Sequence, residues 1–420
     1  MKILHTSDWH LGQYFYGKSR ADEHLQLINW LVVLVEEQQI DAVIIAGDVF
    51  DTGTPPSYAR ELYFSLVAQL NQLGCQLVVL AGNHDSVAML SESKQVLSHL
   101  NTHVIACANK SDTEEQQLIE LTNKQGQHMA TLCAIPFIRP KDVVKSLAGQ
   151  SLQEKQQQLQ QGISNHYHHL YEKAQQLGKP VIMTGHLTTV GATTSDSVRE
   201  IYIGNLEAFP ASQFPPADYI ALGHIHRPQL VAKNERIRYC GSPIALSFDE
   251  TGQEKQVVII EADESSITNI TPQAIPCFQP MATLKTTIDK LAPSLQELAD
   301  QHHHDKPLWL DIEIQATGYL DDISARVQEV INDLPIEALM IRRAKASRQK
   351  MARNNKQQTL AELTVDDVFN ERLAQESWQT EEELTRKTRI TDLFKHYAHG
   401  EGNQSDGQNV SQNKADKESQ

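Results

Sequence analysis

The sequence predicts an α/β protein with a smaller α+β module and a helical segment near its C-terminus. Two observations carry this prediction. Residues 1–85 alternate strand, helix, strand, helix and strand, the pattern of a parallel sheet with crossover helices. Five hydrophobic runs also end in Asp, Asn or His, as strands do when their carboxyl ends line a site. These runs span residues 3–6, 42–46, 76–81, 181–184 and 219–222.

The first predicted domain, residues 1–272, contains all five runs. Helices are expected over residues 21–39 and 57–73, the second with Ser57 as its N-cap and Gly74 as its end. Short strands follow, and the Gln-rich residues 150–176 are typical of a solvated surface helix. The additional strands cover residues 103–106 and 130–134 or begin at Pro180, Tyr219, Arg236 and Gln256.

The Gln-rich helix contains the run His166-Tyr167-His168-His169. Its spacing is compatible with a transition-metal site, but the Gln-rich composition around it is typical of a solvated helix. We therefore assign the run to a solvated helix face.

A second module, residues 273–345, follows a proline-bearing link over residues 271–280. Its pattern is helix, strand, helix, strand, and a module of about 70 residues is near the lower size for independent folding. It is therefore expected to lean on the first domain. The predicted elements span residues 291–299, 308–314, 321–332 and 339–343.

Seven basic residues and no acid lie between Ile341 and Leu360, in a chain whose net charge is -16. Two interpretations are open: a solvated linker, which we place at residues 346–363, or a contact with a phosphate backbone. The basic residues are Arg342, Arg343, Lys345, Arg348, Lys350, Arg353 and Lys356.

Residues 364–400 carry apolar side chains that predict two short amphipathic helices. Such helices have little to bury alone, so they either pack on the first domain or present an apolar face to a partner's groove. Their position after a basic linker favours the partner. Residues 401–420, rich in Gly, Asn, Gln, Ser and charge, are predicted to be disordered.

Composition sets broad limits. The 420 residues are too many for one ordinary core, and the acidic balance argues against coating nucleic acid by bulk charge. Five cysteines without a Cys-x-x-Cys pair indicate reduced thiols, which are expected to be inert packing residues. No run approaches the roughly 18 apolar residues of a membrane span, and no signal peptide is recognised, so the cytoplasm is the expected location.

Seven side chains after the hydrophobic runs are expected to bind two divalent metal ions. Asp8 and His10 should share one side of an extended segment, because alternate residues of a strand point the same way. Asp48 is expected to bridge the ions, with Gly47 turning the backbone away. Nitrogen and oxygen ligands without thiolate suit Mn²⁺, Fe²⁺ or Zn²⁺, and the carboxylates favour Mn²⁺. The expected ligands are Asp8, His10, Asp48, Asn83, His186, His224 and His226.

Two metal ions about 3.5–4 Å apart activate a water molecule and stabilise charge on both oxygens of a phosphoester displacement. His84 follows Asn83 directly, so its ring is expected beside the metals without binding them, where it stabilises charge or protonates the leaving oxygen. Asp85 is expected to fix the orientation or tautomer of a histidine. The ligand set predicts phosphoester hydrolysis, and its completeness argues against a purely structural site.

The motifs Asp-x-His, Gly-Asp-x-x-Asp, Gly-Asn-His-Asp, Gly-His and Gly-His-x-His resemble those of the calcineurin-like metallophosphoesterase superfamily. Longer strings resemble its DNA repair nuclease branch, the nuclease subunits of SbcCD-type complexes. They are HTSDWHLGQYFYGKSR (residues 5–20), GDVFDTGTPPSYAR (47–60) and ALGHIHRPQ (221–229). The likeness is strong over the first domain and looser after it.

The resemblance implies a β-sandwich flanked by helices, a capping domain over residues 273–345 and a partner-binding segment over residues 364–400. It implies His84 as the catalytic histidine. The first metal ion would take Asp8, His10, Asp48 and His226, and the second would take Asp48, Asn83, His186 and His224.

The resemblance also implies a function: a Mn²⁺-dependent nuclease that works with an SMC-like ATPase of the SbcC type, which uses the ATP. Such a pair opens DNA hairpins, degrades double strands 3′ to 5′ and nicks single strands during replication, recombination and repair. A homodimer within a heterotetramer, located in the cytoplasm at the nucleoid, is implied. The alternative is a small-molecule phosphodiesterase or phosphatase, which needs neither a cap nor terminal partner helices.

Two features stay open at this point. Related nucleases carry a histidine where this chain has Asp51, so that histidine's role does not transfer, and Asp51 supports the site or is structural. The aromatic residues of loop 9–16 either stack on a nucleotide or pack the loop itself.

Overall fold

The structure is a computed structural model that describes residues 1–108, 114–144, 151–198, 208–315, 323–344, 369, 373 and 381–398. The chain divides into two compact units, Met1–Ala344 and Lys345–Gln420. All the expected metal ligands lie in the first unit.

One six-stranded sheet carries three of the five expected strand ends. Its order is β14-β13-β1-β4-β5-β6, with β1, β4, β5 and β6 parallel and the other two antiparallel. The helices α1 (Ala21–Glu37) and α2 (Ser57–Gln72) connect β1 to β4 and β4 to β5, which confirms the predicted βαβαβ unit. The strands are β1 (Lys2–Thr6), β4 (Ala42–Ala46), β5 (Gln76–Leu80), β6 (Thr102–Ile105), β13 (Gln256–Ala262) and β14 (Ile267–Ala274).

A second six-stranded sheet, of order β11-β12-β10-β9-β8-β7, carries the other two strand ends. Its strands are β7 (Leu118–Thr122), β8 (His128–Cys133), β9 (Val181–His186), β10 (Tyr219–Gly223), β11 (Gln229–Val231) and β12 (Asn234–Tyr239). Apolar side chains of both sheets pack together between them, among them Ile44 and Val78 from the first and Leu132 and Ala221 from the second. The result is a β-sandwich.

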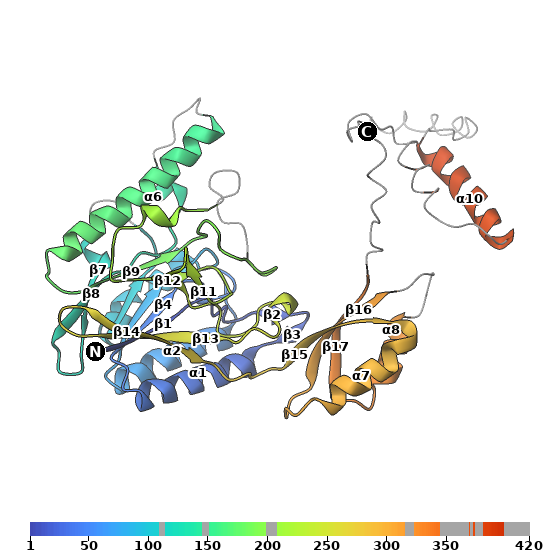
Figure 1. The fold of residues 1–420 in the computed structure, drawn as a ribbon, viewed down its shortest axis with the longest axis horizontal. Helices are drawn as coiled ribbons and strands as arrows, with labels where there is room; N and C mark the ends of the chain where they lie inside the picture. Colours follow the sequence, from blue (N-terminus) through green and yellow to red (C-terminus); the bar gives the residue numbers. More distant parts are fainter. Residues whose placement is uncertain are drawn as a thin grey trace, which may run out of the picture. The chain divides into compact units, whose positions relative to one another are not determined.

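Helices cover both outer faces of the sandwich (Figure 1). α1 and α2 pack on the first sheet, and α6 (Leu152–Gln175) packs on the second. The Gln-rich helix is therefore amphipathic, not solvated all round: Tyr167 is fully buried, and its hydroxyl donates to the carbonyl of Thr184 at 3.0 Å. Among the described residues, His166, His168 and His169 join no group with metal-binding geometry. The flanked sandwich implied by the resemblance is confirmed.

A parallel sheet of order β15-β16-β17 follows β14, and α7 and α8 pack on it. Its strands are β15 (Met281–Thr287), β16 (Leu308–Gln315) and β17 (Ile336–Arg343), and its helices are α7 (Leu291–Asp300) and α8 (Ile323–Ile331). β15 was not predicted from the sequence, because this edge strand is mostly half-buried and lacks a continuous apolar run.

This module touches the hairpin of β2 (Tyr14–Phe15) and β3 (Lys18–Ser19). The ring of Trp309 stacks on Phe15 with centroids 5.8 Å apart, and Lys18 Nζ lies 2.7 Å from Glu337 Oε2. Because the hairpin belongs to the same loop as Asp8 and His10, the module contacts a segment continuous with the expected metal site.

Two of the differences from the predicted element boundaries involve proline. Pro56, with an extended ψ of 159°, occupies the N-cap position of α2, so Ser57 is the first helical residue and not the cap. β14 runs through Pro272, so the predicted link begins inside a strand. β14 lies at the sheet edge, where a missing backbone N–H is tolerated.

In the second unit the structure describes α10 (Glu381–Ala398), Phe369 and Leu373. α10 coincides with the second predicted terminal helix, and Leu384 and Leu393 on it are 49% and 48% exposed. The basic run beyond Ala344, most of the first predicted terminal helix and the tail lie outside the described residues. Among the helices described, none combines the length and the apolar character needed to cross a membrane.

The buried His5 makes one prediction about stability. Burial lowers its pKa to about 3, and its Nδ1 lies 3.0 Å from the hydroxyl of Tyr219. An unfolded histidine titrates near pH 6.5, so between about pH 6.5 and 3 the unfolded chain binds a proton that the folded chain does not. This difference destabilises the fold as pH falls. In His5→Phe, the slope of unfolding free energy against pH should decrease by up to about 1.4 kcal/mol per pH unit.

Urea unfolding in EDTA at pH 7, 6 and 5 measures this slope. His99→Phe, at an exposed histidine, is the matched control and should keep the parent slope. An unchanged slope in His5→Phe would contradict the prediction, whatever its absolute stability.

Candidate metal centre

The five strand ends meet in one place, as the sequence predicts. β1, β4 and β5 are neighbours in the first sheet, and β9 and β10 are neighbours in the second. Their ends bring His and Asp side chains into three groups whose potential ligand atoms lie within 4.8 Å of one another. The groups are Asp8, His10 and His226; His10, Asp48 and His84; and Asp48, His186 and His224.

Asp48 belongs to two of these groups, so it lies between the His10 side and the His186 side of the centre. Asn83 joins the second side: its Oδ1 is 3.0 Å from His186 Nε2 and 3.1 Å from His224 Nδ1. The geometry is compatible with two cations that share one carboxylate.

The backbone at these residues is left-handed and not extended. Asp8, His10, Asp48 and His224 have φ values of 56°, 48°, 48° and 94°. The prediction that Asp8 and His10 alternate along a strand is therefore wrong, because β1 ends at Thr6 and the chain then turns. Backbone hydrogen bonds hold the turn, including Asp8 N to Gly47 O at 3.0 Å. Non-glycine residues in this region are strained, and such strain concentrates at functional sites.

Glycines allow the close approach of these loops. Gly47 has a φ of 95°, and a Cβ there would lie 2.2 Å from His186 Nδ1. A Cβ on Gly82 would lie 2.1 Å from Asp48 Oδ1. Any larger residue at either position would displace a side chain of the centre.

Hydrogen bonds orient the imidazoles. His186 Nδ1 donates to the carbonyl of Ala46 at 2.9 Å, which turns its Nε2 toward Asp48 Oδ2 at 3.2 Å. His10 Nδ1 lies 3.1 Å from Asp51 Oδ1, and its Nε2 faces Asp48 Oδ2 across 3.7 Å. Asp51 thus supports His10. Outer partners of this kind commonly fix the tautomer of metal-binding histidines.

The electrostatics fit a cation site. Burial opposes protonation of His186, but the charge of Asp48 outweighs it and raises the pKa of His186 to about 9. The pKa of Asp48 falls well below its usual range because the cationic imidazoles outweigh its burial. Among the described residues, His10 Nε2 is also buried without a hydrogen-bond partner. Buried carboxylates that attract protons onto nearby histidines would attract a metal ion instead.

His84 lies beside Asp48. Its backbone N–H donates to Asp48 Oδ1 at 2.9 Å, and its Nδ1 donates to the carbonyl of Asp51 at 2.7 Å. The ring centroids of His84 and His10 are 4.6 Å apart. The carbonyl of Asp51 only accepts, so Nδ1 carries a proton.

Asp85 has partners that the sequence did not predict. Its carboxylate accepts from the backbone N–H groups of Gly82, Phe50 and Val49 at 2.8, 3.0 and 3.1 Å. Burial, aided by the charge of Asp48, raises the pKa of Asp85 to about 6. The idea that Asp85 orients a histidine is therefore wrong: it ties the loop after β4 to the loop after β5.

The aromatic residues of loop 9–16 fall into two groups: some pack the loop, and others are exposed. Trp9 is fully buried, with its Nε1 donating to Thr6 Oγ1 at 2.8 Å. Phe15 is buried against the small module, whereas Tyr14 and Tyr16 are 63% and 52% exposed. Only the two tyrosines are available to a ligand.

Three residues near His226 were not predicted from the sequence: Ser197, Glu250 and Lys255. His226 Nδ1 lies 2.6 Å from Ser197 Oγ and 3.3 Å from Glu250 Oε1, and Lys255 Nζ lies 2.6 Å from Glu250 Oε2. Burial of Glu250 is outweighed by His226 and Lys255, which hold its pKa well below its usual range. None of these residues follows a hydrophobic run that ends in a metal-binding motif, so no local signal identifies them.

Two family models match the chain. The model of calcineurin-like phosphoesterases matches residues 1–228, and the model described as type 5 capsule protein repressor C-terminal domain matches residues 277–377. Together with the sandwich and the clustered ligands, the first match defines a metal-dependent phosphodiester hydrolase of the metallophosphoesterase class.

Curated relatives narrow this class. The chain is 48% identical to the SbcD subunit of nuclease SbcCD from Escherichia coli (strain K12), over 94% of this chain and 97% of the relative. It is 30% identical to the SbcD subunit of nuclease SbcCD from Bacillus subtilis (strain 168), over 76% of this chain and 80% of the relative. The chain belongs to the SbcD family of the calcineurin-like phosphoesterases.

Proposed function

We propose that this chain is the Mn²⁺-dependent nuclease subunit of an SbcCD-type complex. With an SbcC-type, SMC-like ATPase that uses the ATP, it opens DNA hairpins, degrades double strands from 3′ to 5′ and nicks single strands. It does so as two copies within a heterotetramer, in the cytoplasm at the nucleoid, during replication, recombination and repair. The observation that carries the proposal is the set of three adjoining His and Asp groups, two of which share Asp48, in a chain 48% identical to a nuclease subunit.

Two Mn²⁺ ions occupy the centre in this proposal, and bound metal ions polarise a phosphodiester and activate a water molecule. The nitrogen and oxygen donors, without a thiolate, suit this ion. The first ion is held by Asp8, His10, Asp48 and His226, and the second by Asp48, Asn83, His186 and His224.

His84 is the catalytic residue in this scheme. Its Nδ1–H is held by the carbonyl of Asp51, so its Nε2 can carry a proton toward the reacting phosphate. From there it stabilises the developing charge or protonates the leaving oxygen. Asp85 supports the reaction indirectly, because it fixes the backbone on which both Asp48 and His84 stand.

Fewer of the aromatic residues in loop 9–16 are available to contact DNA than the sequence suggested. Tyr14 and Tyr16 are exposed beside the small module, which acts as the capping domain, and exposed aromatic rings can stack on bases. Arg342, the first of the seven basic residues, is bound by both carboxylate oxygens of Asp311, at 2.7 and 3.1 Å. The Arg342 side chain is nevertheless half exposed, so this pairing neutralises part of its charge without covering it.

One assay tests the proposal. The purified chain with Mn²⁺ is incubated with linear DNA, hairpin DNA and a nitrophenyl phosphodiester, with and without the SbcC-type ATPase. Cleavage of hairpin and linear DNA is expected. Hydrolysis of the small ester without cleavage of DNA, even with the ATPase present, would instead support a small-molecule phosphodiesterase.

The terminal segment is expected to bind the ATPase. Deletion of residues 364–420 should abolish co-elution with the ATPase and leave Mn²⁺ binding unchanged, because every proposed ligand lies in Met1–Ala344. Analytical gel filtration and a Mn²⁺ titration measure the two properties. Deletion of residues 401–420 alone is the control, and a complex that survives the longer deletion would move the docking surface elsewhere.

A further inference from the structure

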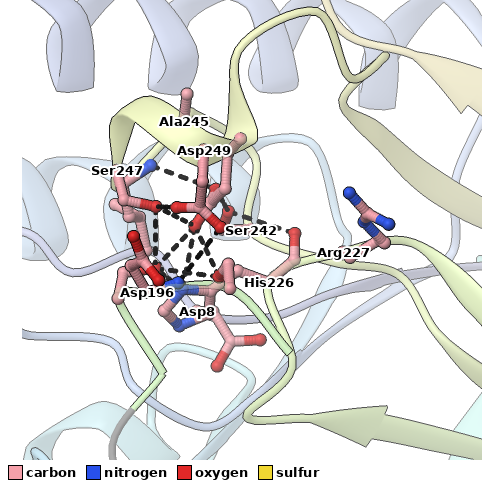
Figure 2. A network of polar contacts seen from close by, with 12 residues as sticks. Asp8, Asp196, His226, Arg227, Ser242, Ala245, Ser247 and Asp249 are labelled. Atoms are coloured by element: carbon pink, nitrogen blue, oxygen red, sulfur yellow. Dashed lines mark hydrogen bonds and ion pairs between the residues drawn. The ribbon is translucent and has the colours of Figure 1, made fainter. Parts of the chain in front are cut away.

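A buried polar cluster lies behind His226, on the side away from Asp8 (Figure 2). We call it the Glu250 cluster: Ser195, Ser197, Ser242, Ser247, Glu250 and Lys255. Glu250 is 1% exposed and Lys255 is 8% exposed. None of these side chains has a role in the proposed metal ligation or catalysis.

Hydrogen bonds saturate the carboxylate of Glu250. Its Oε1 accepts from Ser197 at 2.5 Å and Ser195 at 2.9 Å, and Ser247 Oγ and His226 Nδ1 lie 3.1 and 3.3 Å from the same oxygen. Its Oε2 accepts from Lys255 Nζ at 2.6 Å, Leu246 N at 3.1 Å and Ser242 at 3.3 Å. A carboxylate with this many donors is held in one orientation and stays ionised.

Lys255 is equally constrained. Its ammonium donates to Glu250 Oε2, to Ser242 Oγ at 2.9 Å and to the carbonyl of His226 at 3.2 Å. A buried ion pair is weak evidence for stability, because desolvation offsets most of the attraction. Its direct bond to the His226 backbone suggests that the pair serves this histidine.

The direction of the hydrogen bonds determines the tautomer of His226. The hydroxyl of Ser197 donates its only proton to Glu250 Oε1, so it must accept at 2.6 Å from His226 Nδ1–H. The other nitrogen, Nε2, then keeps its lone pair. His226 groups with Asp8 and His10 on its other side, where a metal ion would bind.

We propose that Glu250 is a positioning residue of the metal centre: it acts mainly through Ser197, 2.6 Å from His226 Nδ1, and less through its own longer contact of 3.3 Å, to hold His226 as the Nδ1–H tautomer with Nε2 left for the first metal ion. Lys255 keeps the carboxylate in place. The inference rests on the proposed function of His226 as a ligand. Loss of such an outer partner commonly weakens metal binding by about 10- to 100-fold.

Electron paramagnetic resonance tests this proposal, because free Mn²⁺ gives a strong signal that binding reduces. The wild-type chain is expected to bind two ions. Ser197→Ala leaves the Glu250–Lys255 pair intact and should weaken the binding of one of the two ions by about 10- to 100-fold. Ser197→Thr, which keeps the hydroxyl, should restore it. Glu250→Gln should weaken the binding of the same ion.

Controls keep the outcomes distinct. Ser98→Ala and Glu264→Gln change exposed residues of the same types and should bind both ions as the wild type does. Thermal unfolding shows whether Glu250→Gln still folds; if it does not, Ser197→Ala decides. Wild-type affinity for both ions in Ser197→Ala overturns the inference. Fewer than two ions on the wild-type chain would overturn the two-metal proposal itself.

Discussion

His84→Gln is expected to keep both Mn²⁺ ions and to lose most DNA cleavage. Glutamine retains a polar side chain but cannot deliver a proton as an imidazolium does, and general acid catalysis is typically worth about 10²- to 10⁴-fold. The ring is held by the Asp51 carbonyl at 2.7 Å, whereas the contact with Asp48 is made by the His84 backbone N–H, which the substitution keeps, so the proposed ligands should stay in place. The rate of hairpin cleavage should therefore fall, while a Mn²⁺ titration should show unchanged binding of both ions.

The matched control is His99→Gln, at an exposed histidine, which should cleave at the parent rate. The structure makes the experiment informative, because His84 lies in the same group of potential ligand atoms as His10 and Asp48. Loss of one Mn²⁺ ion in His84→Gln would show that His84 is a ligand and would refute the assigned role.

Asp48→Asn is expected to have the largest effect on the metal centre. It removes the one carboxylate that both sides share, so both ions should bind more weakly, by more than the roughly 10- to 100-fold cost of losing an outer partner. DNA cleavage should fall to background. The fold should survive, since an amide oxygen can still accept from the His84 N–H that now lies 2.9 Å from Asp48 Oδ1. Mn²⁺ titration, cleavage rates and thermal unfolding measure the three effects.

The control is Asp289→Asn, which removes the same charge at an exposed position. Should Asp48→Asn keep one ion at parent affinity, Asp48 would serve a single metal and the bridging role would be wrong. Unfolding of the variant in the absence of metal would show a structural role in addition.

Much of the fold followed from local patterns. Fully buried strands such as β4 and β5 are continuous apolar runs, and the helices between them are amphipathic, so composition and period predict both. β15 was not predicted, because this half-buried edge strand has no continuous apolar run. The solvated interpretation of residues 150–176 was incomplete, since α6 buries Leu159, Tyr167 and other apolar residues at helical spacing among the glutamines.

The candidate site likewise has features that the sequence predicts and features that it does not. The positions of the expected ligands followed from the rule that strand ends gather at one edge of a sheet, and the structure gathers them. Their conformation did not follow, because a left-handed φ at Asp8 or Asp48 depends on contacts with other loops. For the same reason the partners of Asp85, three backbone N–H groups, were not predictable.

The sequence by itself determined the chemistry available at the centre: carboxylates, imidazoles and one amide, each placed after a hydrophobic run, with a family likeness that points to phosphodiester cleavage. Tertiary structure alone decided which nitrogen of each imidazole faces inward. The ring of His226 meets Glu250, 24 residues along the chain, and the ring of His224 meets Asn83, 141 residues away. Such contacts form only when the sheets pack, because no local pattern encodes which distant donor or acceptor will lie beside a given side chain.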